Sequence, residues 1–271
     1  MDDNAAVELF REFLRIPTLS TTGVETGSYR RAADWLKEKL SELLVGAEVG
    51  ELEVKKGKPI VHATLPGSDP SLPLVLLNSH YDVVPADEQH WDTDPFAAEL
   101  TEDGKIFGRG TQDMKSVCIQ YIVALQRLLV QARKATGAED DAPAFRRTIV
   151  LTFVPDEEIG GRDGMGALLG SDFFKNLGEI GLALDEGLAN PGEKYTVFYG
   201  ERSPWWIIVE AEGPTGHGSR FIENPATHRL LRVAQKGIEF RAQQEKALGL
   251  VEVRALLFMH CDCSVRSAMM I

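Results

Sequence analysis

Cysteine is scarce in this sequence: three residues among 271, Cys118, Cys261 and Cys263. So few cysteines exclude the disulfide framework of a small secreted protein. Long hydrophobic runs are also missing, because none approaches the roughly 20 residues that a membrane-spanning helix needs. The N-terminal sequence is acidic and lacks the basic segment and apolar run of a signal peptide. We therefore expect a cytoplasmic protein that does not enter a membrane.

Basic residues are outnumbered, with 29 Lys and Arg against 41 Asp and Glu and a net charge of −12. This balance argues against broad binding to nucleic acid or to anionic membranes. Hydrophobic residues make up 44% of the chain and charged residues 26%, which is typical of a folded globular protein. The surplus of carboxylates leaves some of them available to bind a metal ion.

Three apolar runs alternate with helical patterns and predict strands buried on both faces, at residues 72–77, 148–154 and 181–184. Helices are expected over residues 4–14 with Asn4 as the cap, over 28–44, and after Asp113 with Tyr121, Leu125 and Leu128 on the buried side. This alternation predicts an α/β domain with a mainly parallel central sheet and helices on both faces.

The pattern changes near residue 201, where a long strand over 205–211 and a helix starting at Asn224 predict a second domain. We expect a catalytic domain over 1–200, the start of a further domain over 201–250, and an atypical tail over 251–271.

Polar clusters follow each predicted buried strand, and one more precedes the long helix. They are His80 with Asp82, Asp113, the run Asp156–Glu158, and Asp185 with Glu186. In open α/β sheets the carboxyl ends of the strands form the ligand-binding crevice, so we expect these groups to meet. One histidine with several carboxylates suits Zn²⁺, with Co²⁺ or Mn²⁺ as substitutes. Hydrolysis also requires a carboxylate that takes a proton from water, and the pair Glu157 and Glu158 offers one ligand and one base.

Each cluster also has an ordinary structural explanation. Asp113 alone is typical of a helix cap, the acidic run of a solvated loop, and His80 of a hydrogen-bonded core histidine. The shared placement of all four clusters favours one common site over four separate explanations.

Several long motifs occur in an order that resembles a known family: HYDVVPADEQHWDTDPF, GRGTQDMKS, FVPDEEIGG, ALDEGLANP, YGERSPWW and GPTGHGSRF. Together they are similar to the aminoacylase-1 branch of zinc-dependent metallopeptidase family 20, over roughly residues 7–248. The resemblance implies a zinc-exopeptidase-like catalytic domain and an α+β lid or dimerisation domain, which is incomplete here. It also implies an amidohydrolase that cleaves N-acyl-L-amino acids to a carboxylate and a free L-amino acid.

The resemblance assigns a role to seven residues. Four of them would bind two zinc ions: His80 and Asp185 the first, Glu158 the second, and Asp113 both. Three would act in catalysis: Glu157 as general base, Asp82 by orienting His80, and His217 by polarising the scissile carbonyl across a homodimer.

Family members are considerably longer, and the resemblance implies that this chain is truncated at its C-terminal end. Their returning segment supplies a late histidine to the second zinc, and only His260 stands near that position, in surroundings that do not match. We therefore expect three protein ligands at the first zinc and two at the second. Two alternatives stay open: an inactive fragment that binds at most one zinc or only dimerises, and a related dipeptidase or carboxypeptidase.

Overall fold

The computed structural model describes residues 1–137, 143–187, 192–194, 196–198, 200 and 207–247. The chain divides into two compact units, Met1–Val197 and Phe198–Ile271, and each is described by itself. Within the described residues, none of the helices combines the length and the apolar character that crossing a membrane requires. The expected tail over 251–271, with His260, lies outside the described residues.

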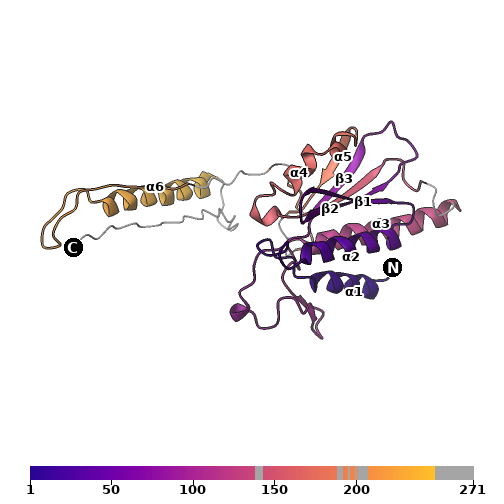
Figure 1. Cartoon of the computed structure of the whole chain (residues 1–271), viewed down its shortest axis with the longest axis horizontal. Coiled ribbons are helices and arrows are strands. Elements are labelled where there is room, and N and C mark those ends of the chain that lie inside the picture. Colours follow the sequence, from indigo (N-terminus) through magenta and orange to yellow (C-terminus); the bar gives the residue numbers. More distant parts are fainter. Residues whose placement is uncertain (138–142, 188–191, 195, 199, 201–206, 248–271) are drawn as a thin grey trace. The chain divides into compact units, whose positions relative to one another are not determined.

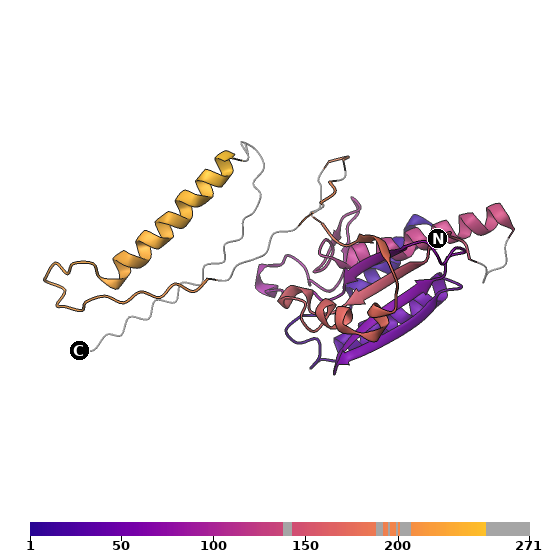
Figure 2. The same cartoon turned by 90° about the horizontal axis from the view of Figure 1, so that it is seen from above.

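A five-stranded sheet forms the centre of the first unit, in the order β1-β2-β6-β3-β7 (Figures 1 and 2). Strand β6 runs parallel to β3, and β3 parallel to β7, whereas β2 is antiparallel to both β1 and β6. Four strands therefore share one direction and only β2 opposes them, as the predicted mainly parallel sheet requires. The strands are β1 (Glu48–Lys55), β2 (Lys58–Leu65), β3 (Leu74–His80), β6 (Ile149–Val154) and β7 (Ile180–Leu184).

Helices cover both faces of this sheet, which confirms the predicted α/β class (Figure 1). Leu77 and Leu151 pack against α1 (Asp3–Leu14), α2 (Ser28–Leu43) and α3 (Lys115–Thr136). Their neighbours Leu76 and Val150 face the opposite side, beside α5 (Asp172–Lys175). Leu168 of α4 (Met165–Gly170) packs with Val154 of β6. Because successive side chains of a strand point to opposite faces, β3 and β6 contribute to both cores. The expected burial of residues 181–184 is wrong, because β7 lies at the edge of the sheet and Leu182 and Leu184 are 50% and 42% exposed. A 3₁₀ turn at Glu88–His90 and a small hairpin of β4 (Glu99–Leu100) and β5 (Ile106–Phe107) complete this part of the unit.

Two details of the helices differ from expectation. Helix α1 is capped by Asp2 rather than Asn4: Asp2 has an extended backbone and its side chain accepts from the amide of Ala5 at 2.8 Å. In α3 Leu125 is buried as predicted, but Leu128 is 48% exposed. The buried stripe passes through Cys118, Ile122, Leu125 and Leu129, because that face, rather than the neighbouring one, meets the sheet.

The second unit contains the expected helix, α6 (Ala226–Ala247), which begins just after Asn224 and Pro225. Its apolar side chains Val233, Ile238 and Phe240 are exposed. Residues 207–211 of the expected strand form no strand in the part of the chain that is described, and residues 205 and 206 lie outside it. The domain limits 201–250 and 251–271 stay predictions.

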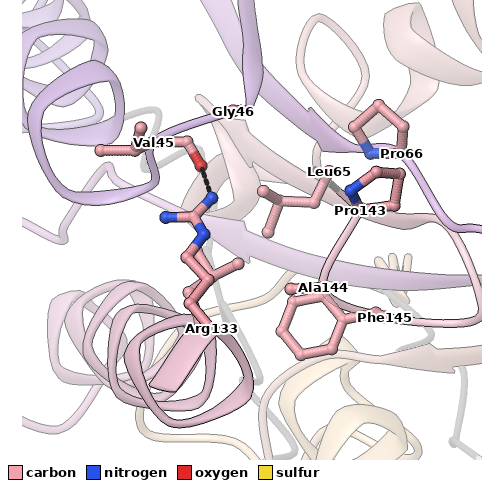
Figure 3. A pocket seen from close by; sticks show the side chains of 9 residues that line it. Val45, Gly46, Leu65, Pro66, Arg133, Pro143, Ala144 and Phe145 are labelled. Atoms are coloured by element: carbon pink, nitrogen blue, oxygen red, sulfur yellow. Dashed lines mark hydrogen bonds between the residues drawn. The ribbon is translucent and has the colours of Figure 1, made fainter. Parts of the chain in front are cut away.

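A small cavity of about 20 Å³ lies where β2 ends, and Arg133 crosses it to donate to the carbonyl of Val45 at 2.7 Å (Figure 3). This volume holds about one water molecule, so it is too small for a substrate. Leu65 pairs with Ile149, the first residue of β6, so the cavity lies at the amino ends of the parallel strands.

The neighbours Leu168 and Leu169 of α4 allow a matched test of the core beside this sheet, because Leu168 is fully buried and Leu169 is 48% exposed. We expect Leu168→Ala to lower the free energy of unfolding by about 2–5 kcal/mol through the lost packing and the cavity left behind. Leu169→Ala should change it by less than about 1 kcal/mol. Urea unfolding followed by circular dichroism measures both values, and equal losses would contradict the described packing.

Candidate metal centre

The carboxyl ends of three parallel strands bring the predicted polar clusters to one edge of the sheet. His80 is the last residue of β3 and pairs with Val154, the last residue of β6, just before Asp156 and Glu157. Leu184 ends β7 beside Leu77 of β3 and is followed by Asp185 and Glu186. Because these strands point the same way, their following loops share one crevice.

His80 lies at the centre of this edge, buried to 1% exposure. Its Nε2 atom lies 3.0 Å from Oδ1 of Asp113, 3.6 Å from Oε1 of Glu186 and 3.7 Å from Oε2 of Glu157. The structure therefore joins residues that are more than 100 positions apart in the sequence. His80 is thus a buried, hydrogen-bonded histidine, as the structural explanation expects, and it also meets three carboxylates from separate loops.

Asp82 contacts His80 at Nδ1, the ring nitrogen that faces away from the other carboxylates. Nδ1 of His80 lies 3.0 Å from the carbonyl oxygen of Asp82 and 3.3 Å from its Oδ1, which leaves Nε2 to face the other carboxylates. The carboxylate of Asp82 is fully buried and accepts from the amides of Glu157 at 3.1 Å and Glu158 at 3.2 Å. One side chain thus orients both the imidazole and the loop that carries the paired glutamates.

Asp113 is not the cap of the following helix. The cap position of α3 is Met114, and Asp113 directs its carboxylate to His80 instead. The start of α3 is also tied to His80, because the amide of His80 donates to Sδ of Met114 and Sγ of Cys118 donates to the carbonyl of His80. This packing places Asp113 at the open side of the imidazole.

Asp185 and Glu186 are neighbours that face different partners. Oδ2 of Asp185 accepts from Nδ2 of Asn78 at 2.7 Å, and its Oδ1 accepts from the amide of Glu186. Glu186 is the residue whose carboxylate reaches His80, although the family motifs assign the ligand role to its neighbour Asp185. Asp185 as a ligand stays a prediction. The one available sequence signal was that Glu186 adjoins Asp185 at the end of the same strand.

The charges of this cluster shift one another's protonation. Burial lowers the pKa of His80, but its hydrogen bonds to the surrounding carboxylates outweigh this and raise the pKa far above its usual range. The hydrogen bond from His80 holds the pKa of the Asp113 carboxyl below its ordinary value. Burial, and then the negative charge of Asp113, raise the pKa of Glu158 to about 7. Burial is also the largest cause of the raised pKa of Glu157. Without a metal ion, the imidazolium is the cation that balances the carboxylates.

Two separations between donor atoms are close to those around a tetrahedral zinc ion. Zinc bonds to nitrogen and oxygen of about 2.0–2.2 Å place neighbouring ligand atoms roughly 3.4 Å apart. Nε2 of His80 lies 3.0 Å and 3.6 Å from the oxygens of Asp113 and Glu186, and all three ligand atoms lie within 4.8 Å of one another. These three residues fit a divalent cation.

His217 belongs to the second unit, where its Nδ1 lies 2.8 Å from Oγ of Ser219 and its side chain is exposed. Its action on a carbonyl, across a dimer, stays a prediction.

Comparison with known proteins places the chain in a family. The model of peptidase family M20/M25/M40 matches residues 76–205. The chain is 45% identical over 249 residues to aminoacylase-1 of Dictyostelium discoideum, and 44% identical over 246 residues to aminoacylase-1 of Mus musculus. The chain belongs to the M20 peptidase family. The predicted resemblance to its aminoacylase-1 branch is therefore confirmed.

The alignments cover 92% and 91% of this M20 chain but 57% and 56% of the two relatives, so it spans a little over half of their length. A solved structure with the same fold is Sso-CP2 from Sulfolobus solfataricus, described as an M20 family metallo-carboxypeptidase. The two share 26% identity at a TM-score of 0.56, over 69% of this chain and 38% of that one.

A metal ion bound at His80 must displace the proton from its Nε2 atom, because only a neutral imidazole nitrogen coordinates. At pH 7 we expect the first divalent ion bound to release about one proton, since the pKa of His80 lies above this pH. Glu158 is partly protonated and should add a fraction of a proton when a second ion binds. The affinity should therefore fall as the pH falls below 7. Titration calorimetry in buffers of different ionisation enthalpy measures the release, and a heat that is the same in every buffer contradicts it.

Proposed function

We propose that the chain is a zinc-dependent amidohydrolase that cleaves N-acyl-L-amino acids to a carboxylate and a free L-amino acid. The observation that carries the proposal is the carboxylate of Glu157, 3.7 Å from the buried His80, in a chain 45% identical to an aminoacylase-1. A glutamate with a raised pKa beside a candidate metal centre has the chemistry of a general base.

His80, Asp113 and Glu186 would hold one zinc ion, and Glu158 with Asp113 would contribute to a second. When bound, the metal supplies a Lewis acid that makes a water molecule more acidic and polarises the acyl carbonyl. Asp185 remains the alternative third ligand of the first ion. Asp82 would keep Nδ1 of His80 occupied, so that Nε2 faces the metal.

Glu157 would accept a proton from the attacking water as its oxygen bonds to the carbonyl carbon of the substrate. The carbonyl oxygen then carries negative charge, which a hydrogen bond from His217 would stabilise. When the carbon–nitrogen bond breaks, Glu157 would return the proton to the departing amine. Atoms balance: water gives its hydroxyl to the acyl group and its proton to the amino acid.

The proposal also specifies the substrate, a second subunit and the place of the reaction. The substrate is a small molecule, and dimerisation through the second unit would bring His217 to the site of another subunit. The scarcity of cysteine favours a reducing compartment, and we place the reaction in the cytoplasm.

The choice between the two acidic neighbours after β7 can be tested by zinc affinity. We expect Glu186→Gln to weaken Zn²⁺ binding more than tenfold, because it removes a charged oxygen 3.6 Å from Nε2 of His80. Asp185→Asn should weaken it less, because this carboxylate contacts Asn78 instead. Competition with a chelating dye gives both affinities. A larger loss in Asp185→Asn would restore Asp185 as the ligand.

The activity can be tested by the release of methionine from N-acetyl-methionine, with zinc stoichiometry measured on the same sample. We expect turnover that Glu157→Gln lowers by about 10²–10⁴-fold without loss of metal, because it removes the base and leaves the ligands in place. The control is Glu102→Gln, at an exposed position on another loop, which should retain full activity.

Dipeptides form the second arm of the assay, because Sso-CP2 is described as a carboxypeptidase. Faster cleavage of dipeptides would transfer the proposal to that substrate class. No turnover of either substrate, with one zinc ion bound or none, would support the alternative of an inactive fragment that binds at most one zinc ion or only dimerises.

A further inference from the structure

One lysine holds both ends of the loop that carries Glu157 and Glu158. Lys58 is the first residue of β2, and its ammonium contacts Oδ2 of Asp156 and, at 2.8 Å, Oδ2 of Asp163. We call residues 156–163 the carboxylate loop. Lys58 is 19% exposed and Asp156 only 2%, so the first of these ion pairs is removed from water.

Asp156 fixes the direction in which the carboxylate loop leaves the sheet. Its carboxylate is fully engaged, because Oδ1 accepts from the hydroxyl of Tyr29 at 2.9 Å and Oδ2 contacts Lys58. Its backbone is left-handed, with φ of 65°, a conformation that aspartate tolerates better than most residues. The amide of Gly161 returns to the carbonyl of Asp156 at 2.7 Å and closes the turn.

The two amides that follow Asp156 are the ones that donate to Asp82. Glu157 and Glu158 are thus attached through their backbones, on one side to Asp156 and on the other to Asp82. Within the described part of the chain no hydrogen bond anchors their side chains, and Oε2 of Glu157 lies 3.7 Å from Nε2 of His80. The position of these carboxylates therefore depends on where Asp156 is held.

We propose that Lys58 is a positioning residue for Glu157 and Glu158, acting through Asp156 and Asp163 on a metal centre that it does not touch. The proposal rests on the proposed function, since it assumes that the cluster binds a metal ion. Without Lys58, the buried carboxylate of Asp156 loses its counter-charge. Turning toward water then lowers the free energy of this carboxylate. The backbone of Asp156, the first residue of the carboxylate loop, moves with it.

Lys37, in the same region of the sheet, provides a control that tests whether the role of Lys58 is purely structural. Lys37 also bridges two carboxylates, Asp34 at 3.2 Å and Glu51 at 2.7 Å, and it is partly buried. It lies on α2, and its two partners lie outside the carboxylate loop. Removing the ammonium of Lys37 leaves Asp34 and Glu51 still paired with Arg30, at 3.5 Å and 2.6 Å. Only the loss at Lys58 should reach the metal centre.

The first experiment titrates the full chain with Co²⁺ and follows the visible absorption, whose bands report coordination geometry. We expect Lys58→Met to weaken Co²⁺ binding by about 10–100-fold, the usual effect of losing an outer support of metal ligands, and to alter the spectrum. Lys58→Arg should restore most of the affinity. Lys37→Met should stay within about twofold of the unsubstituted chain.

The second experiment measures amide hydrogen exchange of the carboxylate loop in the metal-free protein. Exchange at Glu157 and Glu158 should be at least tenfold faster in Lys58→Met and unchanged in Lys37→Met. Should Lys58→Met not fold, Asp163→Asn removes one contact of the lysine at a more exposed position and should show the same effects at smaller size.

The outcomes separate the two proposals. If the unsubstituted chain binds no Co²⁺, the proposed function fails, while the exchange data still decide whether Lys58 holds the carboxylate loop. If that chain binds Co²⁺ and Lys58→Met shows the same affinity, spectrum and exchange, the positioning role is overturned. Equal effects of Lys58→Met and Lys37→Met would likewise overturn it, because they would indicate general destabilisation.

Discussion

The carboxylate of Asp82 contacts three groups on which the metal centre depends: the imidazole of His80 and the amides of Glu157 and Glu158. A fully buried carboxylate is tolerated only when hydrogen bonds and nearby positive charge compensate its lost hydration. Asp82 meets that requirement by binding these three groups, and in doing so it fixes their mutual positions. The loop after β6 and the end of β3 therefore cannot move independently.

The sheet determines which charges meet at this point. Strands β3, β6 and β7 run the same way, so three loops rich in carboxylates begin at one edge. Such a concentration of negative charge is unstable without a cation. In the metal-free protein the imidazolium of His80 is a cation at this point, and the surrounding carboxylates raise its pKa. A divalent metal ion held by His80, Asp113 and Glu186 would take over the same electrostatic role and would add the chemistry of a Lewis acid.

The sequence predicts which end of the sheet carries the candidate site, but it does not predict every residue of that site. Apolar runs followed by His80, Asp156 and Asp185 indicate strand ends, because buried strands and polar loops leave strong local patterns. Local pattern does not decide which of two adjacent acids turns toward His80, since that depends on the amide of Asn78 in another strand. Lys58 is more hidden still: in the sequence it resembles any surface lysine, and its partner Asp163 is 105 residues away.

The carboxylate loop separates anchoring from reactivity among neighbouring acids. Asp156 uses both oxygens inside the protein, whereas Glu157 and Glu158 use their amides for attachment and keep their carboxylates for the crevice. In a fully solvated loop, three neighbouring acids would not divide into anchoring and reactive residues, because every carboxylate would be hydrated. Reactivity at a metal centre is sensitive to displacements of about 1 Å. In the proposed function, a base held by its backbone would keep its position while its own carboxylate changes charge, and repeated proton transfer would require this property.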